Sequence, residues 1–259
     1  MTERESVAET VHVRAQGSTL WITLDRPPLN IIDIPMMRAL DQALSSLPDQ
    51  NAYVIFRGAG PKGFSAGAEV RDHAPDRVAE MLAAFHAIFR RLWHADCVTI
   101  AAVHGHCLGG GCELATSCDF VVAAESAQFG QPEIKLGCFP PVAMVMLPRL
   151  VGPHAALDLI LTGRTISARE AQQLGLATRV VPDDQLNAEV DALLAELRLR
   201  SPAVLGMTRR ALWRSTGLDF DRSLREAEEL YLNRLMKTED AQEGICAFLE
   251  RRVPVWRGR

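Results

Sequence analysis

Short β-branched runs alternate with helical patterns through the first half of the chain, and this alternation constrains the fold more than any other feature. Apolar positions at 3.6-residue spacing predict helices at 35–47, where Pro35 suits the first turn, and from Val78 to Leu92. The runs that read as strands are LWITLDR at 20–26, AYVIFRGAG at 52–60, VTIAAVHG at 98–105 and FVVAA at 120–124. The alternation predicts an α/β fold with parallel strands joined by right-handed crossovers.

Beyond about residue 140 the pattern becomes mainly helical. One further strand is predicted at 177–182, and only helices follow Ser201. We therefore divide the chain into a core domain, residues 1–200, and a helical C-terminal segment, residues 201–259. The segment is too small to fold alone, so its apolar stripes must pack on the core or on a neighbouring subunit.

Composition and charge are those of a globular protein and narrow its partners. Of the 259 residues 48% are hydrophobic, and the net charge is −4. Because no surplus of Lys and Arg can neutralise phosphates, nucleic acid is not expected as a partner. The charged N-terminus lacks the apolar stretch of a secretory signal, and no apolar run approaches the roughly 18 residues that span a bilayer. We expect a cytoplasmic protein without membrane contact.

Metal ligation is the alternative interpretation of six cysteines and an H-x-H pair. The cysteines form no C-x-x-C pair and mostly have apolar neighbours, which is typical of reduced core thiols. His104 and His106 would point to one face of a strand end, but no further ligands can be placed beside them. The sequence therefore predicts no metal site.

A glycine-rich turn, GHCLGGGCEL, follows the apolar strand at 98–105 and opens a short helix. Three consecutive glycines, Gly109 to Gly111, cost backbone entropy and usually mark a tight turn or a close approach. A helix N-terminus presents unpaired N–H groups, the donors that a thioester carbonyl needs as it becomes an enolate. The spacing is not G-x-G-x-x-G and the P-loop lysine is missing, so nucleotide binding is not expected. A turn whose glycines only allow close packing is the alternative.

A second glycine turn, GFSAGAE at 63–69, matches the G-x-S-x-G elbow of serine hydrolases. That elbow leads directly into a helix, whereas Pro75 disfavours an immediate long helix here. Ser65 as a nucleophile is therefore the minor hypothesis. The other interpretations are a plain loop and a loop whose Ala68 N–H is the second donor of an oxyanion hole.

Glu113 and Glu133 form the candidate acid–base pair. Glu113 lies in the first turn of the short helix, where an acidic residue also complements the helix dipole, and Glu133 follows a proline in QFGQPEIKLG. Each residue alone has an ordinary structural explanation. Two carboxylates facing one pocket would push their pKa values apart, so that one could act as acid and the other as base.

Taken together, these segments resemble the crotonase family, also called the enoyl-CoA hydratase/isomerase family, from about Val11 to Trp256. The matching stretches are ITLDRPPLN (22–30), GFSAGAEV (63–70), IAAVHGHCLGGGCELATSCDFVVA (100–123), AQFGQPEIKLG (127–137), LTGRTISAREAQQLGLATRVVP (161–182) and EGICAFLERR (243–252). The resemblance implies a β-β-α spiral core with a helical C-terminal segment used in trimerisation, usually as a dimer of trimers.

The same resemblance implies the reversible addition of water to an enoyl-CoA, with no cofactor besides the coenzyme A of the substrate. The backbone N–H groups of Ala68 and Gly110 would hold the thioester oxygen. Glu133 would exchange the proton at the α-carbon, and Glu113 would deprotonate the water that adds at the β-carbon. Since family isomerases and hydrolases often lack one of the two glutamates, hydration is the leading hypothesis.

Further residues would bind the substrate if the resemblance holds. Arg26 and the Ala66–Ala68 turn would line the coenzyme A groove, together with Gly109. Phe248 and Arg251 on the last helix would reach the coenzyme of a neighbouring subunit.

The departures from the family pattern concern the acyl group. Hydratases of fatty-acid oxidation usually carry G-x-G-G-T after the second glutamate, whereas this chain has Pro140 and Pro141, followed by the bulky Met144 and Met146. These residues should reshape the acyl pocket. The usual aspartate after the AGA turn is Glu69 here. The stretches RPPLNIIDIPMM, EVRDHAPDRVAEML and EIKLGCFPPVA resemble hydratases of the cyclohexa-1,5-diene-1-carbonyl-CoA type.

Three other functions stay open on sequence grounds. The same fold could isomerise, decarboxylate or hydrolyse an acyl-CoA. A serine thioesterase would use Ser65. A non-catalytic relative that binds coenzyme A or RNA would tolerate the loss of Glu113 and Glu133.

Overall fold

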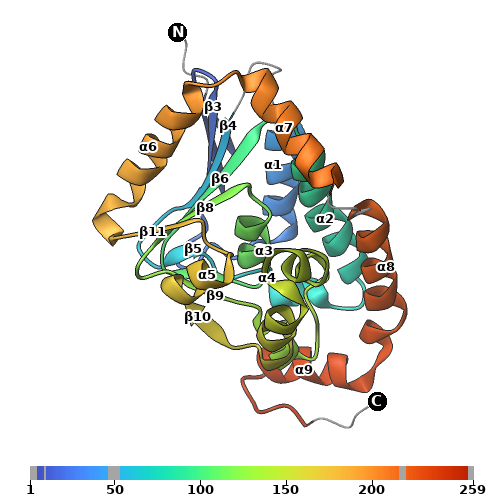
Figure 1. Ribbon diagram of the computed structural model, residues 1–259. Coiled ribbons are helices and arrows are strands. Elements are labelled where there is room, and N and C mark those ends of the chain that lie inside the picture. The colour runs from blue at the N-terminus through green and yellow to red at the C-terminus, as the bar shows by residue number, and fades with distance from the viewer. Residues whose placement is uncertain (1–4, 9, 46–52, 216–219, 256–259) are drawn as a thin grey trace.

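The computed structural model describes residues 5–8, 10–45, 53–215 and 220–255, and its strands form two sheets (Figure 1). The seven-stranded sheet has the order β1 (Glu5–Ala8), β2 (Val11–Gln16), β3 (Thr19–Leu24), β4 (Tyr53–Gly58), β6 (Val98–Val103), β8 (Phe120–Ala124) and β11 (Arg179–Val181). The four-stranded sheet has the order β10 (Thr165–Ser167), β9 (Gln128–Gly130), β7 (His106–Leu108) and β5 (Gly63–Ser65).

Helices follow these strands in a repeating order. The α-helices are α1 (Ile34–Ser45), α2 (Val78–His94), α3 (Gly110–Thr116), α4 (Pro141–Thr162), α5 (Ala168–Leu174), α6 (Leu186–Arg198), α7 (Pro202–Ser215), α8 (Phe220–Asn233) and α9 (Glu239–Leu249). Short 3-10 helices are η1 (Val70–His73), η2 (Pro132–Leu136), η3 (Asp183–Gln185) and η4 (Leu235–Lys237).

Three long strands each lead into a short strand of the second sheet and then into a helix. β4 is followed by β5 and α2, β6 by β7 and α3, and β8 by β9, η2 and α4. The strands β3, β4, β6, β8 and β11 pair in parallel, and so do β5, β7 and β9. The chain therefore winds through a β-β-α spiral, which confirms the predicted fold class.

The large sheet is covered on both faces. Alternate side chains such as Phe56 and Val103 pack in the main core, which also contains the buried sides of α1 and α2, while Ile55 and Ile100 pack with the buried side of α6. Figure 1 shows α6 on one side of the sheet and α1 and α2 on the other. All of β6 is buried, which explains why its sequence is apolar at nearly every position.

The C-terminal helices pack on the core of their own chain. Arg209 on α7 donates to the carbonyl oxygens of Leu92 and Ala95 at the end of α2, at 2.8 and 2.9 Å, and pairs with Asp119 at 2.7 Å. A guanidinium at a helix C-terminus satisfies carbonyls that have no helical partner. The helix α8 contacts α2 and α4, and α9 contacts η1 and η2. The predicted role of this segment in trimerisation stays a prediction.

Some elements differ from the sequence-based expectation. The antiparallel β1–β2 pair and the three-residue strands of the small sheet were not predicted. Residues 46–47 of the first predicted helix, and Trp256, lie outside the described residues. The prediction that His104 and His106 share one strand face is wrong, because β6 ends at Val103 and the chain turns at Gly105, with φ 48°, before β7 begins.

The helix α4 corrects a second expectation. It is 22 residues long and apolar enough to cross a membrane by length and composition, although no such run was expected. Gly152, with φ 78°, interrupts the helical geometry, and Pro148 and Pro153 lie on either side of it. Helix α4 contacts α3, η2 and α8. Its first half packs in the core, where Val142 and Leu147 are fully buried, whereas Leu157 and Leu161 in its second half are exposed.

Candidate functional site

The candidate site lies at the carboxyl edge of the small sheet. Because β5, β7 and β9 run parallel, the chain leaves all three strands at the same edge. The segment Ala66–Ala68 follows β5, Gly109 follows β7, and Glu133 lies just after β9. Three segments that are far apart in sequence are thus brought together by strand pairing.

The two glycine turns contact each other at this edge. A Cβ on Gly67 would lie 3.5 Å from the Gly110 nitrogen, and a Cβ on Gly110 would lie 3.3 Å from the Ala68 nitrogen and 2.8 Å from the Phe85 ring. Within the described part of the chain, neither the Ala68 nor the Gly110 N–H donates a hydrogen bond. Two free backbone donors close together can hold an oxyanion.

Gly109 precedes the Gly110 donor in the chain and contacts both glutamates. Its backbone has φ 51°, and a Cβ there would lie 2.6 Å from Glu133 Oε1. Its carbonyl accepts the Glu113 N–H at 2.9 Å. Glycine is therefore required both by the positive φ and by the approach of the Glu133 carboxyl group.

The Glu133 carboxyl group is poorly satisfied. Its Oε2 atom is buried and has no hydrogen-bond partner among the described residues. Burial, and then the nearby Glu113 carboxylate, raise the pKa of Glu133 well above its usual value. The raised pKa favours the protonated form of the group, which can donate a proton.

Glu113 lies behind Glu133 and is held by the start of α4. Its Oε1 atom accepts the Ala143 N–H at 2.8 Å, and its residue is 3% exposed. Burial raises the pKa of Glu113 to about 7, although the N–H groups of Ala143 and Val142 oppose the shift. A carboxylate with a pKa near neutrality is suited to act as a base.

The two prolines after Glu133 have a structural role at this point. Pro140 is the N-cap of α4 and Pro141 occupies its first turn, where proline is favoured. They start the helix whose first turn donates to Glu113. Neither proline lies among the residues that line the cavity next to the site.

Replacing Glu113 with Gln should change how stability depends on pH. Between the ordinary pKa near 4.5 and the folded value of about 7, the folded wild type retains a proton that the unfolded chain has lost, so stability falls as pH rises. The Gln variant keeps the acceptor for Ala143 but lacks this proton. Its stability relative to wild type should therefore increase from about pH 5 to about pH 8, measured by urea unfolding. A difference independent of pH would contradict the raised pKa.

A cavity of about 500 Å³ opens beside these groups. Its wall includes Ala66, Gly67, Ala68, Gly109 and Glu133, apolar side chains such as Leu29, Ile31, Val70, Ile245 and Phe248, and the polar His73, Lys135 and Arg252. The cavity is therefore mostly apolar, with two cationic side chains in its wall. Such a site can accommodate an elongated ligand that has an acidic end.

The other sequence-predicted residues take different places. Arg26 is absent from this lining and pairs with Glu69 and Asp33, each at 3.4 Å. Phe248 is 53% exposed and lines the cavity of its own chain. Arg251 does not line it. The lining residues His73, Lys135, Cys138 and Arg252 were not singled out from the sequence, because no local pattern marks a side chain that only tertiary packing turns toward a cavity.

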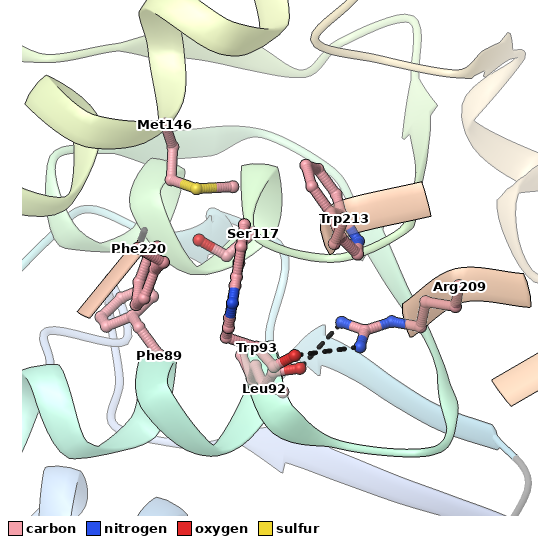
Figure 2. A pocket seen from close by; sticks show the side chains of 8 residues that line it. All are labelled: Phe89, Leu92, Trp93, Ser117, Met146, Arg209, Trp213 and Phe220. Carbon is pink, nitrogen blue, oxygen red and sulfur yellow. Dashed lines mark hydrogen bonds between the residues drawn. The ribbon is translucent and has the colours of Figure 1, made fainter. Parts of the chain in front are cut away.

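A second pocket includes Ser117, the residue that caps the end of α3. Figure 2 shows its lining, which is formed by Phe89, Leu92, Trp93, Ser117, Met146, Arg209, Trp213 and Phe220. Its volume of about 10 Å³ leaves room for one water molecule at most, so no acyl group fits there. Met146 lines this pocket and Met144 is 43% exposed, so neither methionine lines the large cavity.

Ser65 does not have the environment of a nucleophile. It is fully buried, and its Oγ donates to the Asn30 carbonyl at 2.7 Å and accepts the Gly67 N–H at 3.2 Å. The first full α-helix after it begins only at Val78. The hydroxyl therefore braces the Ala66–Ala68 turn.

Replacing Ser65 with Ala should cost roughly 1–3 kcal/mol of unfolding free energy, because the Asn30 carbonyl loses its partner. The catalytic rate should stay within about tenfold of wild type, since both backbone donors remain. A serine hydrolase would instead lose about 10³-fold or more. Steady-state kinetics together with urea unfolding separate the two outcomes.

Metal ligands do not gather in the described part of the chain. No group of three or more His, Cys, Asp or Glu side chains there could hold an ion. All six cysteines are free thiols, and only Cys246 is exposed.

Comparison with known proteins identifies the family. A family model described as enoyl-CoA hydratase/isomerase matches residues 14–259. The chain belongs to the enoyl-CoA hydratase/isomerase family. A probable enoyl-CoA hydratase of Mycobacterium bovis is 41% identical to this family member over 261 residues, covering 97% of this chain and 99% of that protein.

Two further similarities concern function and fold. The cyclohexa-1,5-dienecarbonyl-CoA hydratase of Thauera aromatica is 38% identical over 253 residues, covering 96% of each chain. The crystal structure of an enoyl-CoA hydratase from Mycobacterium avium subsp. paratuberculosis has a TM-score of 0.87 at 28% identity, covering 97% of this chain and 100% of that one. This member of the enoyl-CoA hydratase/isomerase family is thus an enzyme of the hydratase type.

Proposed function

We propose that the enzyme adds water to an enoyl-CoA, with the Ala68 and Gly110 N–H groups as the oxyanion hole and with Glu113 and Glu133 as base and acid. One observation carries the proposal. Two buried carboxyl groups with raised pKa values lie next to two free backbone donors, and Gly109 contacts both glutamates. Pairs of carboxyl groups with shifted pKa values are a common arrangement for acid–base catalysis.

The proposed steps conserve atoms and charge. The two N–H groups hold the thioester oxygen and stabilise negative charge there as water attacks the β-carbon. Glu113 removes a proton from the attacking water, and Glu133 gives its proton to the α-carbon. The proton then passes from Glu113 to Glu133 through solvent, so that the net change is the addition of one water. Glu133 lines the cavity and Glu113 is close enough to raise its pKa, so both groups can serve the same substrate.

For the acyl group we propose a compact, cyclic dienoyl-CoA. The similarity to the cyclohexa-1,5-dienecarbonyl-CoA hydratase of Thauera aromatica supports this substrate class. Crotonyl-CoA, a short linear enoyl-CoA, is the second candidate, because the Mycobacterium bovis relative is named an enoyl-CoA hydratase.

We also propose that the enzyme is a trimer or a dimer of trimers. Leu157 and Leu161 on the second half of α4 are 51% and 62% exposed, and exposed leucines on one helix are typical of a surface that another subunit covers. A monomer in light scattering would contradict this assembly.

The test is a mass-spectrometric and ultraviolet assay of the purified enzyme with crotonyl-CoA and with cyclohexa-1,5-diene-1-carbonyl-CoA. A mass gain of one water on either substrate is expected, and the faster substrate identifies the acyl class. Rapid hydration of crotonyl-CoA with none of the cyclic diene would overturn the cyclic substrate. No water gain on either would overturn hydration itself.

A further inference from the structure

His73 is a polar side chain of the cavity wall that the proposed steps do not use. It ends η1, the short helix that follows the Ala68 donor. Its Nδ1 atom lies 3.1 Å from the Glu69 carbonyl oxygen. Because a carbonyl oxygen can only accept, Nδ1 must carry the proton of this hydrogen bond. In the neutral ring Nε2 then has a free lone pair and is an acceptor.

The backbone that carries His73 is firmly held. The neighbouring Asp72 is 2% exposed, accepts the Ile34 N–H at 3.0 Å and pairs with Arg77 at 3.0 Å. These contacts tie η1 to the starts of α1 and α2. A ring fixed in this way binds a partner without the entropic cost of ordering a mobile loop.

The ring is neutral near pH 7. Burial lowers the pKa of His73, and this effect exceeds the opposing effects of the Glu69 and Val70 carbonyls and of the Asp72 and Glu69 carboxylates. The side chain therefore presents an acceptor rather than a positive charge.

His73 and Glu133 line the same cavity. Both η1, which carries His73, and η2, which carries Glu133, contact α9. The wall near His73 includes Val70, and α9 contributes Ile245 and Phe248. An acceptor in a largely apolar wall favours a ligand that places a donor against it. A ligand that covered the acceptor without such a donor would leave it buried and unpaired, which is unfavourable.

We propose that His73 determines specificity, and that its Nε2 accepts a hydrogen bond from a hydroxyl group on the acyl part of the thioester. This inference takes two points from the proposed function: the ligand is an acyl-CoA, and its acyl part lies at the Glu133 end of the cavity. The substrate class is then narrowed to cyclic dienoyl-CoA compounds that carry a hydroxyl on the ring beyond the β-carbon.

Binding of unreactive thioesters tests the proposal without turnover. The ligands are cyclohexane-1-carbonyl-CoA and its 3-hydroxy and 4-hydroxy derivatives, none of which has a β-hydroxyl to eliminate. Isothermal titration calorimetry compares wild type, His73→Leu, which lacks an acceptor, and His73→Gln, which retains one. Wild type should bind one hydroxy derivative about tenfold more tightly than the parent ring. The preference should disappear in His73→Leu and persist in part in His73→Gln.

Several outcomes would overturn the role of His73. Equal affinity of wild type for all three ligands would do so without any variant. A preference that survives in His73→Leu would assign it to another residue. An equal loss of affinity for all three ligands in His73→Leu would place Nε2 against the pantetheine amides instead. Selective binding combined with no hydration in the assay above would overturn the proposed reaction alone, so the two failures are distinguishable.

Discussion

Glu133→Gln should lower kcat for hydration by roughly 10²–10⁴-fold and leave KM within a few-fold of wild type. Gln has nearly the shape of the protonated glutamate, so the contact with Gly109 can be kept. It cannot give a proton to the α-carbon, however. Because the raised pKa of Glu133 favours the protonated form of the wild-type group, the main effect of the variant is the loss of a proton that can be transferred.

The measurement is the formation of the hydrated thioester at several substrate concentrations, which separates kcat from KM. Glu125→Gln is the matched control, because Glu125 is exposed, pairs with Arg169 and should leave kcat unchanged. Deuterium exchange at the α-carbon in heavy water is a second readout, and it should fall together with kcat. A Glu133→Gln enzyme with near wild-type kcat would exclude Glu133 as the acid.

Gly109→Ala should remove most of the activity, with a loss of about 100-fold or more. The new methyl group would lie 2.6 Å from Glu133 Oε1, so the carboxyl group must leave the position from which we propose that it serves the α-carbon. A misplacement of a catalytic group by about 1 Å can slow a proton transfer by about 100-fold. The positive φ also strains an alanine at this position, which should cost about 1–3 kcal/mol of stability.

Gly60→Ala is the control that separates strain from displacement. Gly60 also has a positive φ, 73°, but a Cβ there would meet no atom within 4 Å. Both variants should therefore be less stable in urea, whereas only Gly109→Ala should lose activity. Equal activity losses in the two variants would show that general destabilisation, rather than the position of Glu133, explains the effect.

The sequence by itself determined the parallel α/β core and indicated where its chemistry lies. The run at 98–105 is apolar because β6 is buried on both faces, and the spacing from Val78 to Leu92 reflects the buried side of α2. The resemblance of whole segments to a known family singled out Glu113 and Glu133. Strands and helices can be recognised in the sequence because burial of one face gives apolar residues a period of two in strands and of 3.6 in helices.

Only the tertiary structure decided how the site is built. A strand of three residues is too short to show an alternating pattern of apolar and polar residues. The small sheet that brings Ala68, Gly109 and Glu133 to one edge could therefore not be predicted from local patterns. Contacts between distant segments also determine that the Ser65 hydroxyl is buried and supports the Ala66–Ala68 turn. In the same way, Pro140 starts the helix whose first turn donates to Glu113. These roles depend on contacts between segments distant in sequence, and a local pattern contains no information about such contacts.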